Sequence, residues 1–151
     1  MSENNTPPAF DDLMSLDRQV CFGLYAASNL VTRQYRPLLA ELGLTFPQYL
    51  VMLVLWQSEP QTVGAIGERL HLDSGTLTPL LKRLEIGGFV VRRRDEADER
   101  RVLISLTDAG RALHAPARRI AEAFRRNVSF SMAETESLAT SLNQLISALE
   151  R

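Results

Sequence analysis

The sequence predicts a mainly α-helical fold with one β-hairpin, in which a winged helix-turn-helix lies between N- and C-terminal helical regions. Three patterns support this class: apolar residues recur at helical spacing along most of the chain, two short helix patterns meet across a tight turn, and a strand-like hairpin pattern follows them directly. The 151 residues, of which 45% are hydrophobic and 23% charged, fit one globular domain.

The domain organisation follows from composition and from the placement of the apolar stripes. We expect residues 1–10, which are rich in Ser, Asn, Thr and Pro, to form a disordered tail and 11–151 to form a single domain. Segments 11–44 and 108–151 are expected to be dimerisation helices around a winged unit at 45–107, because their apolar faces need a partner surface. No apolar run approaches the roughly 18 residues of a membrane span, and the polar, acidic N-terminus is unlike a signal or transit peptide. We therefore expect a cytoplasmic homodimer that does not bind membranes.

The first helical region extends from Leu13 to Leu42 and is either one helix or two, with Pro37 as a possible point of bending. A second helix is predicted to start after Thr45, with Pro47 in its first turn and Gln48 placed for a capping box. Its sequence is apolar on nearly every side, which predicts a buried helix.

Two further helices form the predicted helix-turn-helix. Thr62 caps the first, and Asp73 or Ser74 caps the second, which ends at the glycines 87–88. The hairpin follows, with strands at 89–94 and 102–106 and a highly charged connection between them. Thr107 is then predicted to cap a helical region that reaches the C-terminus with a break near residues 129–136.

Polar and basic side chains gather on the predicted second helix and hairpin. Seven basic and five acidic residues lie between 82 and 101, so DNA affinity would depend on how the hairpin distributes them between its faces. Arg100 at the hairpin tip suits a narrow minor groove, where the negative potential is strongest. Alternatively, the charges form a solvated hairpin and the hydroxyls only cap a helix. The candidate DNA contacts are Ser74, Thr76, Thr78, Lys82, Arg83, Arg92, Arg94 and Arg100.

Cys21 is the only cysteine, so the chain has no internal disulfide, and His71 and His114 are too isolated to predict a metal site. No cofactor is expected either. Tyr25 lies four residues after Cys21, on the same helix face. Tyr35 lies 14 residues away, or ~21 Å along a straight helix, so a contact with Cys21 needs a folded-back helix or a partner chain. Alternatively, Cys21 has no chemical role and is a buried residue that only packs against its neighbours.

Two stretches carry a family resemblance. The segment "LDSGTLTPLLKRLEIGGFVVRRRDEADERRVLISLTDAGRAL" resembles the winged-helix core of MarR-type repressors, whose wing motif D-x-R-x3-(I/L/V)-x-LT starts here at Asp98. The segment "QVCFGLYAASNLVTRQYRPLLAELGLTFPQYLVMLVLW" is similar to the organic hydroperoxide resistance regulators of that family. The resemblance adds Asp98 to the DNA-binding candidates. It also identifies Cys21 as a peroxide-sensing thiol of the one-cysteine type.

In that group the sensor thiol is held by two tyrosines of a site shared between subunits. The resemblance places one of them at Tyr35, whereas Phe46 occupies the position of the other. This departure removes a phenol that would stabilise the thiolate, although Tyr25 and Tyr49 are nearby phenols.

These observations predict a non-enzymatic, dimeric repressor that binds a pseudo-palindromic double-stranded DNA operator. An organic hydroperoxide would oxidise Cys21 to a sulfenic acid, which is then capped by a low-molecular-weight thiol or a backbone nitrogen, or is overoxidised, and the operator would be released. Three alternatives remain: a MarR-type repressor released by a small ligand with Cys21 passive, a thiol peroxidase, and a purely structural helical dimer. A thiol peroxidase would need a resolving cysteine, which this chain lacks. Salt-dependent DNA binding would exclude the purely structural dimer.

Overall fold

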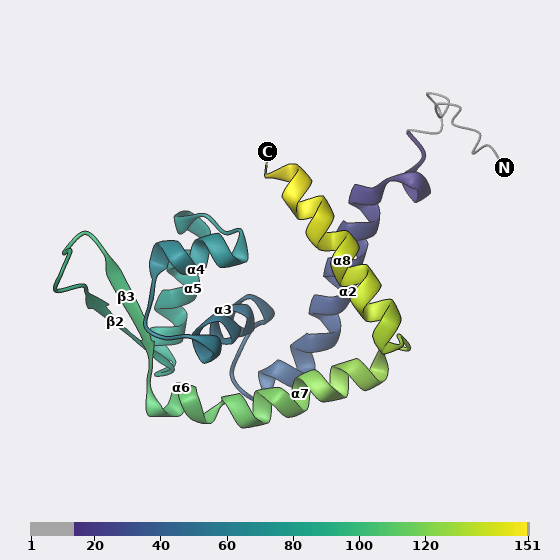
Figure 1. Cartoon of the computed structure of the whole chain (residues 1–151). Helices are drawn as coiled ribbons and strands as arrows, with labels where there is room; N and C mark the ends of the chain where they lie inside the picture. Colours follow the sequence, from purple (N-terminus) through teal and green to yellow (C-terminus); the bar gives the residue numbers. More distant parts are fainter. Residues whose placement is uncertain (1–13, 151) are drawn as a thin grey trace.

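The computed structural model describes residues 14–150, so the expected tail at 1–10 lies outside the described part of the chain. The winged unit occupies one side of the molecule, α7 leads away from it, and α2 and α8 form the other side (Figure 1). The elements, in chain order, are a 3-10 helix at Leu16–Arg18, α2 at Val20–Ala40, α3 at Phe46–Gln57, β1 at Gln61–Thr62, α4 at Val63–Leu70, α5 at Ser74–Ile86, β2 at Val90–Arg94, β3 at Val102–Leu106, α6 at Asp108–Ala112, α7 at His114–Asn127 and α8 at Met132–Leu149.

The N-terminal region is a single long helix, α2, preceded by the short 3-10 turn. Pro37 lies inside α2, which continues to Ala40. The two halves of this helix differ in burial: Tyr35 and Leu39 are buried, whereas the apolar side chains of the first half are exposed. The exposed set comprises Val20, Leu24, Tyr25 and Leu30.

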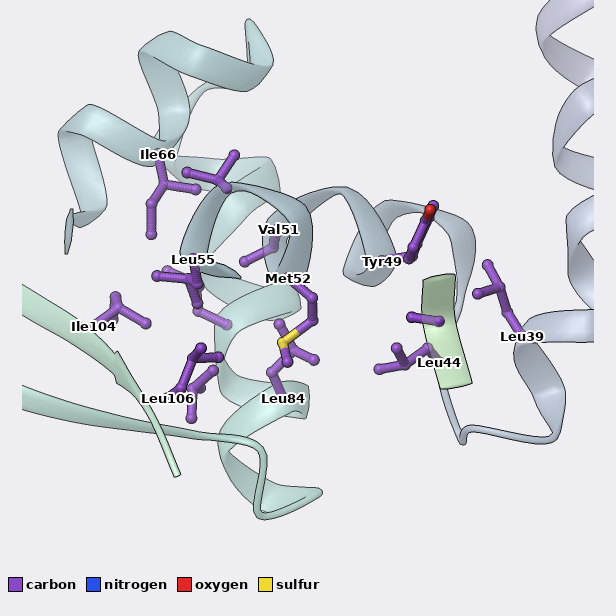
Figure 2. Packing of buried hydrophobic residues seen from close by; sticks show 14 of the residues in the cluster. Leu39, Leu44, Tyr49, Val51, Met52, Leu55, Ile66, Leu84, Ile104 and Leu106 are labelled. Atoms are coloured by element: carbon purple, nitrogen blue, oxygen red, sulfur yellow. The ribbon is translucent and has the colours of Figure 1, made fainter. Parts of the chain in front are cut away.

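The buried helix α3 forms the centre of the molecule. The predicted capping box is confirmed, since the Thr45 hydroxyl accepts from the Gln48 N–H and the Gln48 side chain accepts from the Thr45 N–H. One end of α3 packs Tyr49 near Leu39 and Leu44, and the rest packs into the winged unit (Figure 2). The buried α3 residues are Gln48, Tyr49, Val51, Met52, Val54 and Leu55.

The helix-turn-helix and wing have the predicted elements. Thr62 and Asp73 are confirmed as the caps of α4 and α5, and Gly88 follows α5 with a φ of 79° that favours glycine. The sheet differs from the prediction, because β1 adds a third strand in the order β1-β3-β2, all antiparallel. A two-residue strand shows no alternation, and its pairing with Ile104 joins distant parts of the chain, so local pattern gave no sign of it.

The C-terminal region also contains an unpredicted break. Thr107 caps α6 as expected, but α6 ends at Ala112 and α7 begins at His114; the single residue between them, Leu113, keeps right-handed helical dihedral angles. The expected second break is confirmed between α7 and α8, where Ser131 and Glu134 form a capping box. Most of α8 is exposed, and its large apolar residues are uncovered: Met132, Leu138, Ile146 and Leu149. No helix within residues 14–150 combines the length and apolarity that crossing a bilayer requires.

Candidate DNA interface and thiol site

The turn between α4 and α5 is tight and well capped. His71 ends α4 in the left-handed conformation (φ 53°), and a Cβ on Gly67 would lie 2.8 Å from the Leu72 carbonyl oxygen. Asp73 then accepts from the Thr76 N–H at 2.8 Å, and this hydrogen bond lowers the pKa of the Asp73 carboxyl. The capped turn therefore fixes the direction in which α5 leaves α4.

Helix α5 separates a packing face from an exposed polar face. Leu77, Leu81 and Leu84 are buried against the rest of the winged unit. The candidate DNA contacts all lie on the exposed side: Ser74, Thr76, Thr78, Lys82 and Arg83. Ser74, Thr78 and Lys82 follow one another at four-residue spacing and so form one stripe along the helix. This stripe gives the hydroxyl and ammonium donors that a helix in a major groove uses.

The hairpin places its arginines by register. Arg92 pairs with Ile104 and Arg94 with Val102, so both arginines are on the strand face that carries the buried Ile104. Arg92 is half-buried and Arg94 is exposed. Both lie on the same face as Ile104, and Arg94 is nearer the tip of the hairpin, where the core no longer covers this face. Arg93 points to the opposite face. The alternation expected for the hairpin thus divides the basic side chains between two faces.

At the tip of the wing, Asp98 orients Arg100. Its carboxylate accepts from the Arg100 main-chain N–H at 3.1 Å, from Nε at 3.0 Å and from the terminal nitrogen at 3.2 Å. The hydrogen bonds from Arg100 lower the pKa of the Asp98 carboxyl. Asp95 forms an ion pair with Arg101 at 3.6 Å. Asp98 therefore positions Arg100, whose side chain stays 91% exposed.

An aromatic cluster joins three helices. The Tyr35 ring stacks on the Phe124 ring of α7, with their centroids 4.2 Å apart. Its centroid lies 5.1 Å from that of Phe46 and 5.6 Å from that of Tyr49, both of α3. Burial raises the pKa of Tyr35 to about 12, with further contributions from charge repulsion by Tyr49 and from a side-chain hydrogen bond to it. Burial also raises the pKa of Tyr49, although the hydrogen bond from Tyr35 acts the other way. Both phenols are therefore neutral near pH 7.

Cys21 lies apart from this cluster. It is exposed on the first turn of α2, and its thiol donates to the Gln19 side-chain oxygen at 3.4 Å. Tyr25 is on the same helix and is exposed. Its spacing would allow a hydrogen bond with Cys21, but none joins them within residues 14–150. Because Cys21 and Tyr35 share one continuous helix, ~21 Å separates them within the chain. Of the two arrangements that would bring Tyr35 to Cys21, the folded-back helix is thus excluded. Only the Tyr35 of a partner chain could then contact Cys21.

Two further residues were not singled out by sequence. Phe124 completes the aromatic cluster from a helix 89 positions after Tyr35, a distance over which periodicity carries no signal. Glu59 accepts from the Leu106 main-chain N–H and from Arg111, and so ties the base of the wing to α6. Trp56 makes a parallel link from α3 by donating to the Gly110 carbonyl oxygen at 3.0 Å.

Comparisons with known proteins give a consistent result. The model of the SarA/Rot transcriptional regulator family matches residues 33–115. The organic hydroperoxide resistance transcriptional regulator of Bacillus subtilis is 57% identical over 102 residues, which are 68% of this chain and 69% of that protein. The regulator SarZ of Staphylococcus aureus is 38% identical over 132 residues, 87% of this chain and 89% of that protein.

Among solved structures, AbfR of Staphylococcus epidermidis is similar over nearly the whole chain. Reduced AbfR bound to DNA aligns with a TM-score of 0.77 at 38% identity, covering 95% of this chain and 100% of that one. The disulfide form of AbfR aligns less well, with a TM-score of 0.61 at 37% identity over 93% of each chain.

Proposed function

The chain belongs to the MarR-type winged-helix transcriptional regulators, in the organic hydroperoxide resistance group, and we propose that it is a repressor that releases its operator when Cys21 is oxidised by an organic hydroperoxide. The position of Cys21 is the main support for this proposal. The only thiol of the chain is exposed at the start of a helix half in which Val20, Leu24, Tyr25 and Leu30 stay exposed within the described residues 14–150. An inert packing cysteine would be expected inside the core instead.

A homodimer would cover these apolar faces. The first half of α2 and the length of α8 expose large apolar residues, whereas most residues of the buried core lie in the winged unit. Two copies that pair through α2 and α8 would bury these faces and bring the thiol of one subunit toward the aromatic cluster of the other. The ~21 Å between Cys21 and Tyr35 within one chain favours this shared arrangement over a site in a single subunit.

The exposed stripe of α5 and the wing would bind the operator. In this proposal Ser74, Thr78 and Lys82 enter a major groove, and Arg100, positioned by Asp98, reaches the adjacent minor groove. Two symmetric subunits would then read a pseudo-palindromic site with half-sites about one helical turn apart. The better alignment with reduced, DNA-bound AbfR than with its disulfide form supports a DNA-binding conformation of this chain.

The oxidation step is a two-electron transfer. The Cys21 thiolate attacks one oxygen of the hydroperoxide, the O–O bond breaks, and the sulfur becomes a sulfenic acid, while the alkoxide leaves and takes up a proton from water to become an alcohol. Because the chain has no second cysteine, a low-molecular-weight thiol would then condense with the sulfenic acid to form a mixed disulfide and water. The added group would alter the dimer contact and with it the spacing of the two α5 helices.

Operator binding by the wild type and Cys21→Ser, each with and without an organic hydroperoxide and a small thiol, tests the proposal. The DNA would come from upstream of the protein's own gene, and a salt titration would establish phosphate binding. Release by the wild type alone is expected. Release of both proteins, or of neither, would contradict a role for Cys21.

One observation favours a second candidate, a repressor released by a small ligand with Cys21 passive. A cavity of about 190 Å³ lies between α3 and α7, lined in part by Tyr49, Trp56, His114 and Arg118. Its aromatic walls and basic side chains suit a small anionic aromatic compound. Operator release from Cys21→Ser upon titration with such compounds would support this alternative.

A further inference from the structure

The C-terminal end of α8 returns to the helix-turn-helix. Figure 1 shows α8 running from the end of α7 back toward α4. Glu150 follows the last residue of α8, and its Oε1 lies 3.1 Å from Nδ1 of His71. Glu150 also lines a cavity of about 540 Å³, whose other walls come from α4, from α5 and from the turn between them. The arm formed by α7 and α8 is thus joined to the winged unit at both of its ends.

His71 lies in the turn that determines the direction of α5. It ends α4 in the left-handed conformation (φ 53°), and only Leu72 separates it from Asp73, the cap of α5. Asp73 in turn accepts from the Thr76 main-chain N–H. A contact at His71 therefore acts on the segment that orients the DNA-reading helix relative to the arm.

Three carboxylates line the cavity that His71 borders. Glu68 comes from α4, Asp73 from the start of α5 and Glu150 from the end of α8. Arg69, which is also on α4, donates to the Gln57 side chain at 2.6 Å. Histidine changes charge between pH 5 and 8, so a charged imidazole at the lower end of this range would strengthen the contact with Glu150.

We propose that this contact, the His71–Glu150 tether, holds the winged unit in its operator-binding orientation relative to α7 and α8. The chain aligns better with reduced, DNA-bound AbfR than with the disulfide form of AbfR, so the tethered arrangement resembles that of a DNA-bound chain. A winged unit that turns away from α8 must break the tether. The inference rests on operator binding by the winged unit and is independent of the chemistry of Cys21.

The exposure of the two side chains sets the size of the effect. The side chains of His71 and Glu150 are 53% and 57% exposed, so water and salt screen their attraction. Exposed ion pairs correspond to a factor of ~1.5 to 5 in an equilibrium constant. The tether therefore biases the orientation of the winged unit without locking it, and a change elsewhere in the dimer can still move the unit.

A double-mutant cycle on operator affinity tests the tether in the full-length, reduced protein at pH 6. His71→Asn removes the imidazole and keeps a residue type that tolerates the left-handed conformation, and Glu150→Ala removes the carboxylate. Each variant should bind the operator ~1.5- to 5-fold more weakly than the wild type, and the double variant no more weakly than either one. Additive losses, or no loss from either substitution, would overturn the tether.

Glu136→Ala is the matched control, because it removes an exposed carboxylate from the other end of α8. Its operator affinity should equal that of the wild type or be slightly higher, since one repulsive charge is lost. A loss as large as that of Glu150→Ala would contradict the tether. The losses of His71→Asn and Glu150→Ala should shrink at pH 8, where histidine is neutral, and losses of unchanged size would contradict an ion pair.

A chemical cross-link tests the geometry without the ion pair. In a Cys21→Ser background, His71→Cys and Glu150→Cys would be joined by a short bismaleimide, and a denaturing gel would separate linked monomers from linked dimers. The expected product is linked within one chain and regains the operator affinity lost with the ion pair. Glu85→Cys with Glu150→Cys is the control pair and should link far less, since Glu85 lies ~16 Å beyond Ser74 along α5.

The outcomes separate the tether from the proposed function. Linked dimers alone, no linked product, or loss of operator binding on cross-linking would overturn the tether. Failure of the wild type to bind any operator would refute the proposed function instead. Release that depends on Cys21, together with an additive cycle at His71 and Glu150, would refute only the tether.

Discussion

Replacing Asp98 with alanine is expected to weaken operator binding, although the change removes a negative charge from the tip of the wing. Asp98 holds Arg100 through three hydrogen bonds of 3.0–3.2 Å, while the Arg100 side chain remains 91% exposed. Arg100 is therefore already oriented before it meets DNA. Without Asp98, binding must order this long side chain.

The two opposing effects differ in size. Ordering one rotamer-rich side chain on binding corresponds to ~2- to 10-fold in affinity. Removing one partly exposed carboxylate should tighten binding by less than about twofold, because water and salt screen its repulsion of the DNA phosphates. The loss of orientation is the larger effect, so Asp98→Ala should bind the operator several times more weakly.

Operator titrations at fixed ionic strength would measure this difference, with Glu99→Ala as the matched control. Glu99 is an exposed carboxylate next to Asp98, and the described contacts of Arg100 are to Asp98 instead. Glu99→Ala removes the same charge and should bind slightly more tightly. If Asp98→Ala binds as tightly as Glu99→Ala, or if it still weakens binding in an Arg100→Ala background, the orientation argument is wrong.

Four other expectations concern stability and binding. Leu81→Ala should cost about 2–5 kcal/mol of unfolding free energy because Leu81 is fully buried. Lys82→Ala, at the exposed neighbouring position, should leave the unfolding curve unchanged while reducing the salt slope of operator binding by about one. Gly110→Ala should destabilise the chain by about 1–3 kcal/mol or more in denaturant unfolding, because its Cβ would lie 2.1 Å from the Phe89 carbonyl oxygen. Tyr35, with a pKa of about 12 against an ordinary value of 10, should make stability fall as pH rises from 10 to about 12, and Tyr35→Phe should flatten that dependence.

Local chemistry explains which elements the sequence could predict. The caps Thr45, Thr62 and Thr107 each accept from an N–H three residues ahead, so their signal lies within one helical turn. Strand β1 and the contacts of Glu59 depend on partners more than forty residues away. No periodicity in one segment reports on such pairings, and the sequence argument missed both.

The candidate site divides in the same way. Residue type and spacing placed the stripe of α5 and the tip of the wing correctly on exposed faces, because both follow from helical and strand periodicity. They did not indicate that the Asp98 carboxylate accepts hydrogen bonds from both the main chain and the side chain of Arg100. Nor did they indicate that Phe124 stacks on Tyr35. These contacts depend on the conformation of a turn and on tertiary packing.

In the proposed dimer, the aromatic cluster would link the thiol of one subunit to the DNA-reading unit of the other. Tyr35 lies where α2 leaves its exposed half and meets α3 and α7, and α3 continues into the core beneath α5. The winged unit carries most of the buried residues, whereas the exposed halves of the arms depend on a partner. A modified Cys21 that can no longer approach the Tyr35 of the other subunit would therefore act at the joint between the arms and the winged unit. Movement of two rigid winged units about that joint changes the spacing of their α5 helices without unfolding either one, and a loss of operator affinity with unchanged helical content is the expected signature.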